Sequence, residues 1–365
     1  LLRGYAEDLS LSDWLNKKVF PFEARLTDED IYNGTLLAMA EMLRFGVVST
    51  TDMYFGGEAN SRAVLEAGAK MNLSLAVTCF DDRAAHELPQ YQETLGMLDS
   101  FHNAGDGRLK LDLAIHAEYT STPKVAAGMA ELAARTGLRM HLHLSETRDE
   151  QEACKARHGG KTPARYFYDL GVFDAPTTAA HCVWLEGEDF SLLREKGVTV
   201  ASCPVSNLKL ASGFCPAPRL LQEGVSVALG TDGVASNNNL NLLEEVKLFA
   251  TLFKATSADP TAISARQALW AATRAGALAQ GREDCGLMRT GMRADLIVLD
   301  QRRRPYLHPC HDMVGNVVFA AQGSDVCLTM VDGRVLYRDG EYTTIDLERA
   351  IRNAETSARR IISEL

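Results

Sequence analysis

Seven strand-like runs alternate with helix-period segments between residue 27 and about residue 280, and this alternation constrains the fold more than any other feature. Helix-period segments such as 29–44, 123–136 and 239–255 separate the runs. Strand-helix alternation of this length indicates a parallel sheet with helical crossovers. A closed barrel and an open doubly wound sheet both fit the alternation alone. The strand-like runs span residues 46–55, 73–80, 109–119, 138–146, 177–185, 198–207 and 225–233.

Polar side chains gather at the carboxyl ends of these runs. A (β/α)8 barrel builds its active site at that face from many strands, whereas an open sheet concentrates it at one switch point. We therefore predict an α/β fold with a (β/α)8 TIM-like barrel. A closed barrel needs an eighth strand, which would precede residue 27. The polar residues are Asp52, His116, Glu118, His143, Glu146, His181, Asn207 and Asp232.

The pattern changes after about residue 285. The stretches "GLMRTGMRADLIVLD" and "DVCLTMVDGRVLYRDGEY" read as antiparallel strands, with Asp332-Gly333 as a hairpin signal. We predict a barrel over residues 1–285, a small unit of the β-sandwich type over 286–343, and a terminal helix over 344–365.

Composition excludes several classes of protein. A net charge of −10 with no basic stripe argues against nucleic-acid binding. No apolar run approaches the roughly 18 residues that a membrane helix needs. Cysteines such as Cys79, Cys182, Cys203 and Cys327 lie in apolar strand-like runs without C-x-x-C pairs, which is typical of buried, reduced thiols. We therefore expect a cytoplasmic protein that acts on a small molecule and forms a homo-oligomer.

The stretch "RMHLHLSET" (139–147) holds two histidines and a glutamate that could bind a metal or transfer protons. Side chains alternate along a strand, so His141 and His143 share one face, and His143 lies nearer the carboxyl end. Glu146 follows just past that end. Two histidines satisfied in a polar barrel core remain the alternative interpretation of this stretch.

Two further strands weigh against that alternative. "AAHCVWL" places His181 on the next strand, and "ALGTDGVASNN" ends a later one in Asp232. Imidazoles and a carboxylate that converge from separate strands are what a catalytic metal of the zinc class requires. Taken singly, His181 could be a core residue and Asp232 a helix cap.

The motifs "HLHLSET", "AAHCVWL", "CPVSNLKLASG", "LGTDGVASNNNLNL" and "GMRADLIVLD" resemble the amidohydrolase superfamily. The sequence is most similar to its branch of 5-methylthioadenosine and S-adenosylhomocysteine deaminases and their chlorohydrolase relatives, and the resemblance covers the whole chain. It implies one divalent metal, most often Zn²⁺, with Fe²⁺ or Mn²⁺ as alternatives.

The resemblance also implies a role for each matching residue. His143 and Asp232 would bind the metal, and Asp232 and Glu146 would also contact the substrate. Glu146 would carry a proton from the activated water to the substrate ring, and His181 would lie beside that water. His116 and Glu23 would contact the substrate, Glu23 through the ribose hydroxyls.

Two departures from the family pattern stand out. The family's H-x-H pair on the first barrel strand would lie upstream of Leu1, so two further histidine ligands are absent here, and we expect a truncated chain. The S-adenosylhomocysteine deaminases also place an arginine near the end of the third strand. Here that end reads "AVTCFDDR", with Cys79 near the position and Arg83 as a substitute. The sequence therefore lacks the family's arginine for an amino-acid tail at that position.

The resemblance implies hydrolytic deamination of an adenine nucleoside, such as 5-methylthioadenosine, adenosine, 5-deoxyadenosine or S-adenosylhomocysteine. Water would attack purine C6 and release ammonia. The alternatives are the same chemistry on guanine, a pterin or a chlorotriazine, or a metal-free, non-catalytic barrel if the truncation is genuine.

Overall fold

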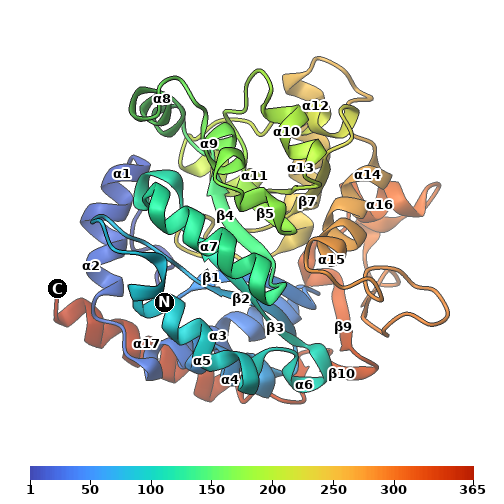
Figure 1. Cartoon of the computed structure of the whole chain (residues 1–365). Coiled ribbons are helices and arrows are strands. Elements are labelled where there is room, and N and C mark those ends of the chain that lie inside the picture. Colours follow the sequence, from blue (N-terminus) through green and yellow to red (C-terminus); the bar gives the residue numbers. More distant parts are fainter.

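The computed structural model describes all residues 1–365, and its centre is a curled parallel sheet (Figure 1). Its seven strands are hydrogen-bonded in sequence order, so each strand pairs with the one before it. The predicted parallel sheet is confirmed, and each of the seven predicted runs overlaps one of its strands. The strands are β1 (Ser49–Tyr54), β2 (Lys70–Leu75), β3 (Leu109–Ile115), β4 (Met140–Leu144), β5 (Thr177–His181), β6 (Thr199–Ser202) and β7 (Ser226–Leu229).

The sheet curls into a half-barrel whose outer strands, β1 and β7, do not pair with each other. The strand expected before residue 27 is not found among residues 1–26. That stretch forms helical turns instead: α1 (Leu11–Trp14), the π-helix η1 (Leu15–Val19) and α2 (Phe20–Glu23). Ser10 caps α1 by accepting a hydrogen bond from the Asp13 amide.

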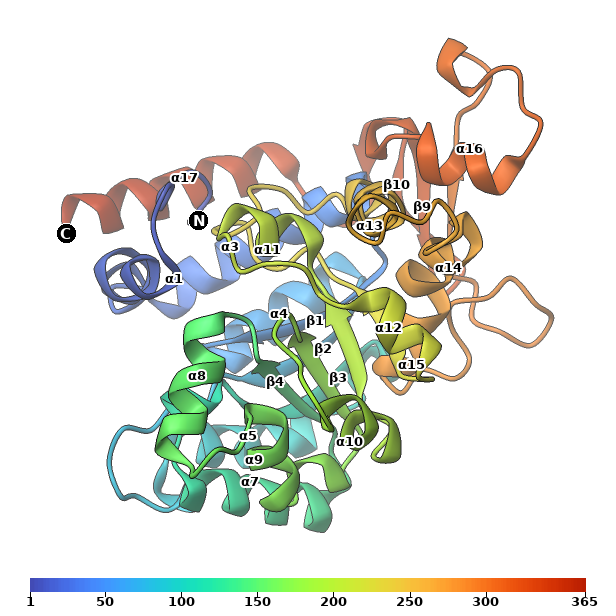
Figure 2. The same cartoon turned by 90° about the horizontal axis from the view of Figure 1, so that it is seen from above.

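Helices cover the outside of the curled sheet, as expected for βα crossovers (Figure 2). The α-helices are α3 (Asp28–Arg44), α4 (Gly57–Ala67), α5 (Pro89–Phe101), α6 (Ala104–Gly107), α7 (Pro123–Thr136), α8 (Arg148–Arg157), α9 (Pro163–Asp169), α10 (Asp189–Glu195), α11 (Pro204–Lys209), α12 (Ala217–Gln222), α13 (Leu242–Thr256), α14 (Ala265–Trp270) and α15 (Gly276–Ala279). Short 3-10 or π segments are η2 (Ala85–Glu87), η3 (Glu118–Thr120), η4 (Val172–Asp174) and η5 (Ala271–Ala275). None of the helices is long and apolar enough to cross a bilayer.

A second, antiparallel sheet follows the barrel, as the sequence predicts. It contains β8 (Leu296–Leu299), β9 (Val326–Val331), β10 (Arg334–Arg338) and β11 (Glu341–Tyr342), in the order β11-β10-β9-β8. Asp332 and Gly333, both with positive φ, form the predicted hairpin turn between β9 and β10. The connection from β8 to β9 holds η6 (Pro305–Leu307), α16 (Met313–Phe319) and η7 (Gly323–Asp325).

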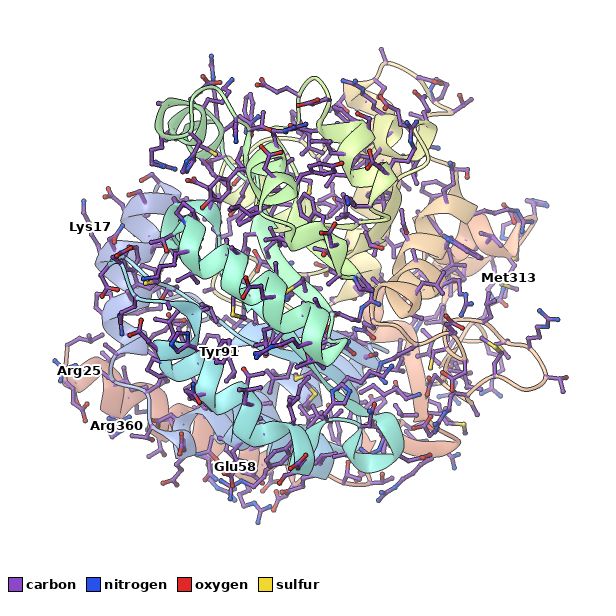
Figure 3. All side chains as sticks on the ribbon, in the orientation of Figure 1. Lys17, Arg25, Glu58, Tyr91, Met313 and Arg360 are labelled. Atoms are coloured by element: carbon purple, nitrogen blue, oxygen red, sulfur yellow. The ribbon has the colours of Figure 1, made fainter.

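The last helix, α17 (Leu347–Ser363), returns to the start of the chain and packs beside α3 (Figure 2). Arg360 pairs with Asp30 and donates to the Arg25 carbonyl oxygen at 3.0 Å (Figure 3). Asn353 Nδ2 donates to Asn33 Oδ1 at 3.2 Å. The predicted terminal helix therefore joins the two ends of the described chain.

The amino end of the parallel sheet holds buried charges that are paired with one another. Lys70, the first residue of β2, lies between the carboxylates of Asp295 and Asp332, with Nζ 2.7 Å from Asp332 Oδ1. Burial alone would lower the pKa of Lys70, but the hydrogen bonds from its ammonium group to these carboxylates raise it. Asp295 directly precedes β8 and Asp332 directly follows β9, so this ion pair links the antiparallel sheet to the barrel.

Two further sets of hydrogen bonds lie beside Lys70 at the amino end of the sheet. Asn72 Nδ2 donates to both oxygens of the buried Asp112 carboxylate, at 3.1 and 2.9 Å. Arg282 donates to Asn72 Oδ1 at 3.0 Å and to the Met71 carbonyl oxygen at 3.1 Å. Each charged side chain here has a partner within the protein.

The hydrophobic core fills the space between the sheet and its helices. Leu142 and Leu144 of β4 are fully buried in it, and His141 and His143 point to the opposite face. This is the alternation that the sequence predicts. All eight cysteines are free thiols; Cys79, Cys182 and Cys203 are buried as predicted, but Cys327 is half exposed because β9 belongs to the small sheet.

Candidate active site

A cavity of about 740 Å³ runs along the inside of the half-barrel. Its lining reaches from the carboxyl ends of the strands to Lys70 and Arg282 at their amino ends. The volume lies within the range of small-molecule sites, roughly 300–1,000 Å³. The lining includes every predicted site residue: Glu23, His116, His143, Glu146, His181 and Asp232.

His143 presents one free ring nitrogen to the cavity. Its Nδ1 lies 2.8 Å from the His116 carbonyl oxygen, which can only accept, so Nδ1 carries the hydrogen. The Nε2 lone pair is therefore available to a metal, and an outer hydrogen bond of this kind orients metal-binding histidines. Burial, with the nearby His181 charge, lowers the pKa of His143, which favours the neutral, coordinating form.

Four imidazoles gather around this position. The His143 ring stacks on His181, with centroids 5.4 Å apart, and lies 4.9 Å from His116 and 6.3 Å from His141. Burial, followed by the charges of neighbouring histidines, lowers the pKa of His116 and of His141 to about 3. Both rings are therefore neutral at physiological pH, and His141 lies deeper, where its Nδ1 is 3.3 Å from Ser74 Oγ.

The pKa of His181 is raised, whereas the pKa values of the other three histidines are lowered. Burial alone would lower its pKa, but the carboxylates of Glu146 and Asp232 and the hydrogen bond to Asn207 raise it. His181 Nδ1 lies 2.9 Å from Asn207 Oδ1, and Nε2 lies 3.8 Å from Glu146 Oε2. The ring is thus held from behind by Asn207 and faces a carboxylate.

Asp232 follows β7 and is held by three donors. Ser206 and Ser236 donate to Oδ2 at 2.6 and 2.8 Å, and the Gly233 amide donates to Oδ1 at 2.7 Å. Burial would raise its pKa, but the nearby His181 and the Ser206 hydroxyl lower it, so the carboxylate is ionised. The next residues form a turn rather than an α-helix, so Asp232 is not a helix cap.

Glu146 is buried in the loop between β4 and α8, and the Ser212 hydroxyl donates to its Oε1 at 3.2 Å. Across the cavity, Glu23 at the end of α2 accepts a hydrogen bond from Tyr54 of β1. Burial raises the pKa of Glu23 to about 7, against the effect of that hydrogen bond. Burial, together with the charge of Asp232, likewise raises the pKa of Asp52 to about 6.

Three strands leave the sheet through left-handed backbone at the site. Ser145 after β4 has φ +49°, His181 at the end of β5 has φ +70°, and Asp232 after β7 has φ +59°. Such conformations in residues other than glycine cluster at functional sites and are stabilised by surrounding contacts. The strain supports this end of the sheet as the functional end.

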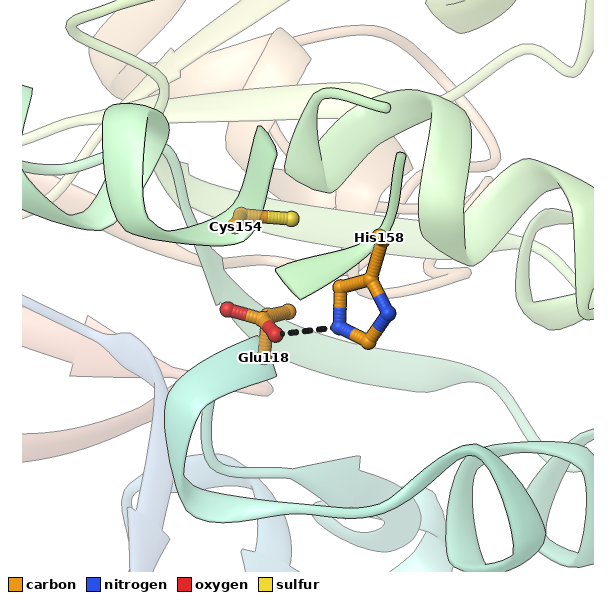
Figure 4. A group of neighbouring side chains, drawn as sticks. All are labelled: Glu118, Cys154 and His158. Atoms are coloured by element: carbon orange, nitrogen blue, oxygen red, sulfur yellow. Dashed lines mark hydrogen bonds and ion pairs between the residues drawn. The ribbon is translucent and has the colours of Figure 1, made fainter. Parts of the chain in front are cut away.

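Glu118 does not face the cavity, although the sequence grouped it with the other strand-end residues. Its carboxylate turns outward to His158 Nε2 at 2.7 Å and to Arg157, with Cys154 beside it (Figure 4). The donor atoms of Glu118, Cys154 and His158 all lie within 4.8 Å of one another. Arg157 already occupies this carboxylate, and burial raises the pKa of Cys154 to about 12, so the cluster is an ion-pair network rather than a cation site.

The proposed replacement for an arginine at the end of the third strand also lies elsewhere. Arg83 is exposed and paired with Asp81 at 2.9 Å, and neither Arg83 nor Cys79 lines the cavity. The only cations in the lining, Lys70 and Arg282, lie at the amino ends of the strands and are partnered there.

The groups that hold the site together are not among the predicted site residues. Ser206, Ser212 and Ser236 lie within the motifs that carry the family resemblance, but serine is common in loops and marks no role by itself, and Tyr54 reads as an ordinary strand residue. The spacing of Thr147 and Glu150 at the start of α8, typical of a helix start, is a further local signal for a structured loop beside Glu146.

Known proteins resemble this chain over most or all of its length. The sequence profile of the amidohydrolase family matches residues 1–336. A 5-methylthioadenosine/S-adenosylhomocysteine deaminase from Pelotomaculum thermopropionicum is 42% identical over 363 residues, covering 100% of this chain and 83% of the relative. A 5'-deoxyadenosine deaminase from Methanosarcina mazei is 42% identical over 367 residues, covering 100% of this chain and 84% of the relative. The crystal structure of an adenosine deaminase from Xanthomonas campestris with bound zinc matches with a TM-score of 0.93 and 32% identity, over 99% of this chain and 82% of that one. Because the family profile matches residues 1–336 and a relative is 42% identical over the whole chain, the chain belongs to the amidohydrolase family.

Proposed function

We propose that this protein is a metal-dependent deaminase of adenine nucleosides, in which water adds to purine C6 and the amino group leaves as ammonia. The observation that carries the proposal is the convergence of His143, Glu146, His181 and Asp232 at one end of a single cavity. The relatives named as deaminases of such nucleosides support the same substrate class.

His143 and Asp232 fit as two of the ligands of one divalent metal, for which we propose zinc. His143 offers a free Nε2 and Asp232 an ionised carboxylate, and both are borderline-to-hard donors that suit zinc. When bound, such an ion supplies an ionised water at neutral pH. The zinc in the related adenosine deaminase supports this choice over Fe²⁺ or Mn²⁺.

The residues of this chain then move the protons. Glu146 takes one proton from the attacking water and delivers it to the ring nitrogen beside C6, which makes that carbon electrophilic. Asp232 takes the second proton, from the new C6 hydroxyl, and gives it to the amino group, which leaves as ammonia. Positioned proton transfer of this kind contributes about 10²–10⁴-fold to rate. His181, whose pKa is raised, stabilises negative charge on the attacking oxygen.

The far side of the cavity favours a nucleoside with a neutral 5' group. An ionised Glu23 accepts hydrogen bonds from the two ribose hydroxyls, and Tyr54 orients it. The catalytic end of the lining has no lysine or arginine that could pair with the carboxylate of an amino-acid tail. We therefore rank 5'-deoxyadenosine, 5-methylthioadenosine and adenosine above S-adenosylhomocysteine.

The test is a substrate panel with ammonia and chloride release as the readout. We expect ammonia from the three neutral nucleosides and at least a tenfold lower kcat/KM for S-adenosylhomocysteine, about 1.4 kcal/mol. Faster turnover of guanine, a pterin or a chlorotriazine would replace the nucleoside assignment with that ring. A correctly folded protein that neither contains nor takes up metal would support a non-catalytic barrel instead.

A further inference from the structure

We infer that Glu150 is a positioning residue that fixes the backbone of the loop carrying Glu146. The inference rests on the proposed role of Glu146 in proton transfer and deepens it. Glu150 lies four residues beyond Glu146, in the first turn of α8, and its side chain does not line the cavity.

Both carboxylate oxygens of Glu150 are used on this loop. The Ser145 amide donates to Oε1 at 3.0 Å, and the Glu146 amide donates to Oε2 at 2.7 Å. Glu150 is itself buried, with 5% of its surface exposed. A carboxylate taken out of water is costly unless its oxygens are satisfied, and here two main-chain amides satisfy them.

This contact differs from an ordinary helix start. In a capping box, the acidic residue at the third helical position accepts from the amide of the N-cap residue. Thr147 is the N-cap of α8 and accepts from the Glu150 amide at 3.1 Å. Glu150 reaches past Thr147 to the two preceding amides, so it holds the loop rather than the helix alone.

The loop needs this support because its backbone is strained. Ser145 has φ +49°, a left-handed conformation that residues other than glycine rarely adopt. The Ser145 carbonyl also accepts from the Val183 and Trp184 amides, at 3.0 and 2.9 Å, and so links this turn to the one after His181. Glu150 thus fixes two amides of this loop, and the loop after His181 fixes one of its carbonyls. Together these contacts determine the position of the Glu146 backbone, from which its side chain extends.

The test compares Glu150→Gln with a matched control, Asp189→Asn. Asp189 is also fully buried at a helix start, where it accepts from the Glu186 amide at 2.9 Å and the Thr162 hydroxyl at 2.6 Å, but it lies outside the cavity. Both variants should melt at a lower temperature than the unchanged protein. Only Glu150→Gln should lower kcat, by about 10²-fold with KM within about threefold, because a misplacement near 1 Å costs about that much.

A second readout does not depend on turnover. Amide hydrogen exchange in a peptide spanning residues 140–150 should be faster by roughly tenfold or more in Glu150→Gln and unchanged in Asp189→Asn. Metal content should be equal in both. If Glu150→Gln does not fold, Glu150→Asp keeps the charge but is too short to reach both amides, and the same kcat loss is expected.

The inference is overturned if Glu150→Gln keeps its kcat while losing stability like the control, or if it loses metal. Glu146→Gln, measured in parallel, separates this failure from that of the proposed function. Full turnover in Glu146→Gln would remove the proton-transfer role, whereas a slow Glu146→Gln beside a fast Glu150→Gln would remove only the positioning role.

Discussion

The two ends of the parallel sheet both bury charged side chains, but they use them differently. At the amino end, Lys70 lies between two carboxylates, and Asn72 satisfies both oxygens of Asp112. At the carboxyl end, His143 has a free ring nitrogen, and Asp232, which also lines the cavity, accepts only one hydrogen bond on Oδ1.

The difference separates stability from function within one sheet. Buried charge with every partner inside the protein fixes the structure, whereas buried groups that face a cavity with unused lone pairs are prepared for something outside it. The same division is general in (β/α) barrels, where the base of the barrel maintains the fold and the carboxyl face carries the chemistry. Substitutions at the two ends should therefore change different measurable quantities.

The largest effect on turnover is expected from Asp232→Asn. The variant removes an ionised ligand and the acceptor for the second proton, so kcat/KM should fall by about 10⁴-fold or more and bound metal should decrease. Ammonia release and metal analysis of the purified protein check this. A variant that keeps both metal and activity would show that Asp232 only closes a turn.

Glu146→Gln should rank next. The amide keeps the shape of the side chain but cannot carry a proton, so kcat should fall by about 10²–10⁴-fold while metal stays bound. Steady-state kinetics and metal content measure the two parts separately. Loss of metal in this variant would make Glu146 a ligand rather than a proton carrier.

A smaller effect, on KM and its pH dependence, is expected from Glu23→Gln. Because burial raises the pKa of Glu23 to about 7, the carboxyl is neutral below that pH and ionised above it. KM for adenosine should therefore fall as the pH rises through about 7. The substitution should abolish this dependence and raise KM about tenfold above pH 7, since hydrogen bonds to a charged group contribute about 1.5–3 kcal/mol. An unchanged KM would argue against ribose binding by Glu23.

The same shift has a consequence for stability. Glu23 binds more protons in the folded state than in the unfolded state, where its pKa is 4.5. Its contribution to the free energy of unfolding should therefore decrease as the pH rises from about 4.5 to about 7. Denaturant titrations at several pH values should show a smaller decrease in Glu23→Gln.

The smallest effect on turnover, with the largest on stability, is expected from Lys70→Met. Removing the ammonium leaves two carboxylates without their shared partner, which costs about 3–5 kcal/mol for a buried pair. Denaturant unfolding measures that loss, and kcat in the folded protein should stay within about twofold. A large drop in kcat at full stability would contradict the division between the two ends.

The sequence predicts the strands and the inward face of β4 well, for a physical reason. Alternation along a strand is local, so the positions of His141 and His143 against Leu142 and Leu144 follow from the backbone alone. Convergence of His181 and Asp232 on the same end follows equally from parallel strand order. The roles of Glu23 and His116 came only from the family resemblance, because nothing in their local sequence marks them.

What the sequence could not predict depends on contacts between distant segments. Glu118 ends a strand just as His116 does, but its side chain is drawn outward by Arg157 and His158, about 40 positions later. Ser212 reaches Glu146 across 66 positions. Such pairings are set by packing after the barrel forms, and no local pattern encodes them.

The ion pair of Lys70 with Asp295 and Asp332 also limits how the molecule can open. If the antiparallel sheet moved away from the barrel, the buried ammonium of Lys70 and the carboxylates of Asp295 and Asp332 would lose their partners. This would cost several kcal/mol. The barrel and the antiparallel sheet should therefore move as one rigid body. Ligands would then enter and leave through the loops beyond the strands, including the loop that bears Glu146.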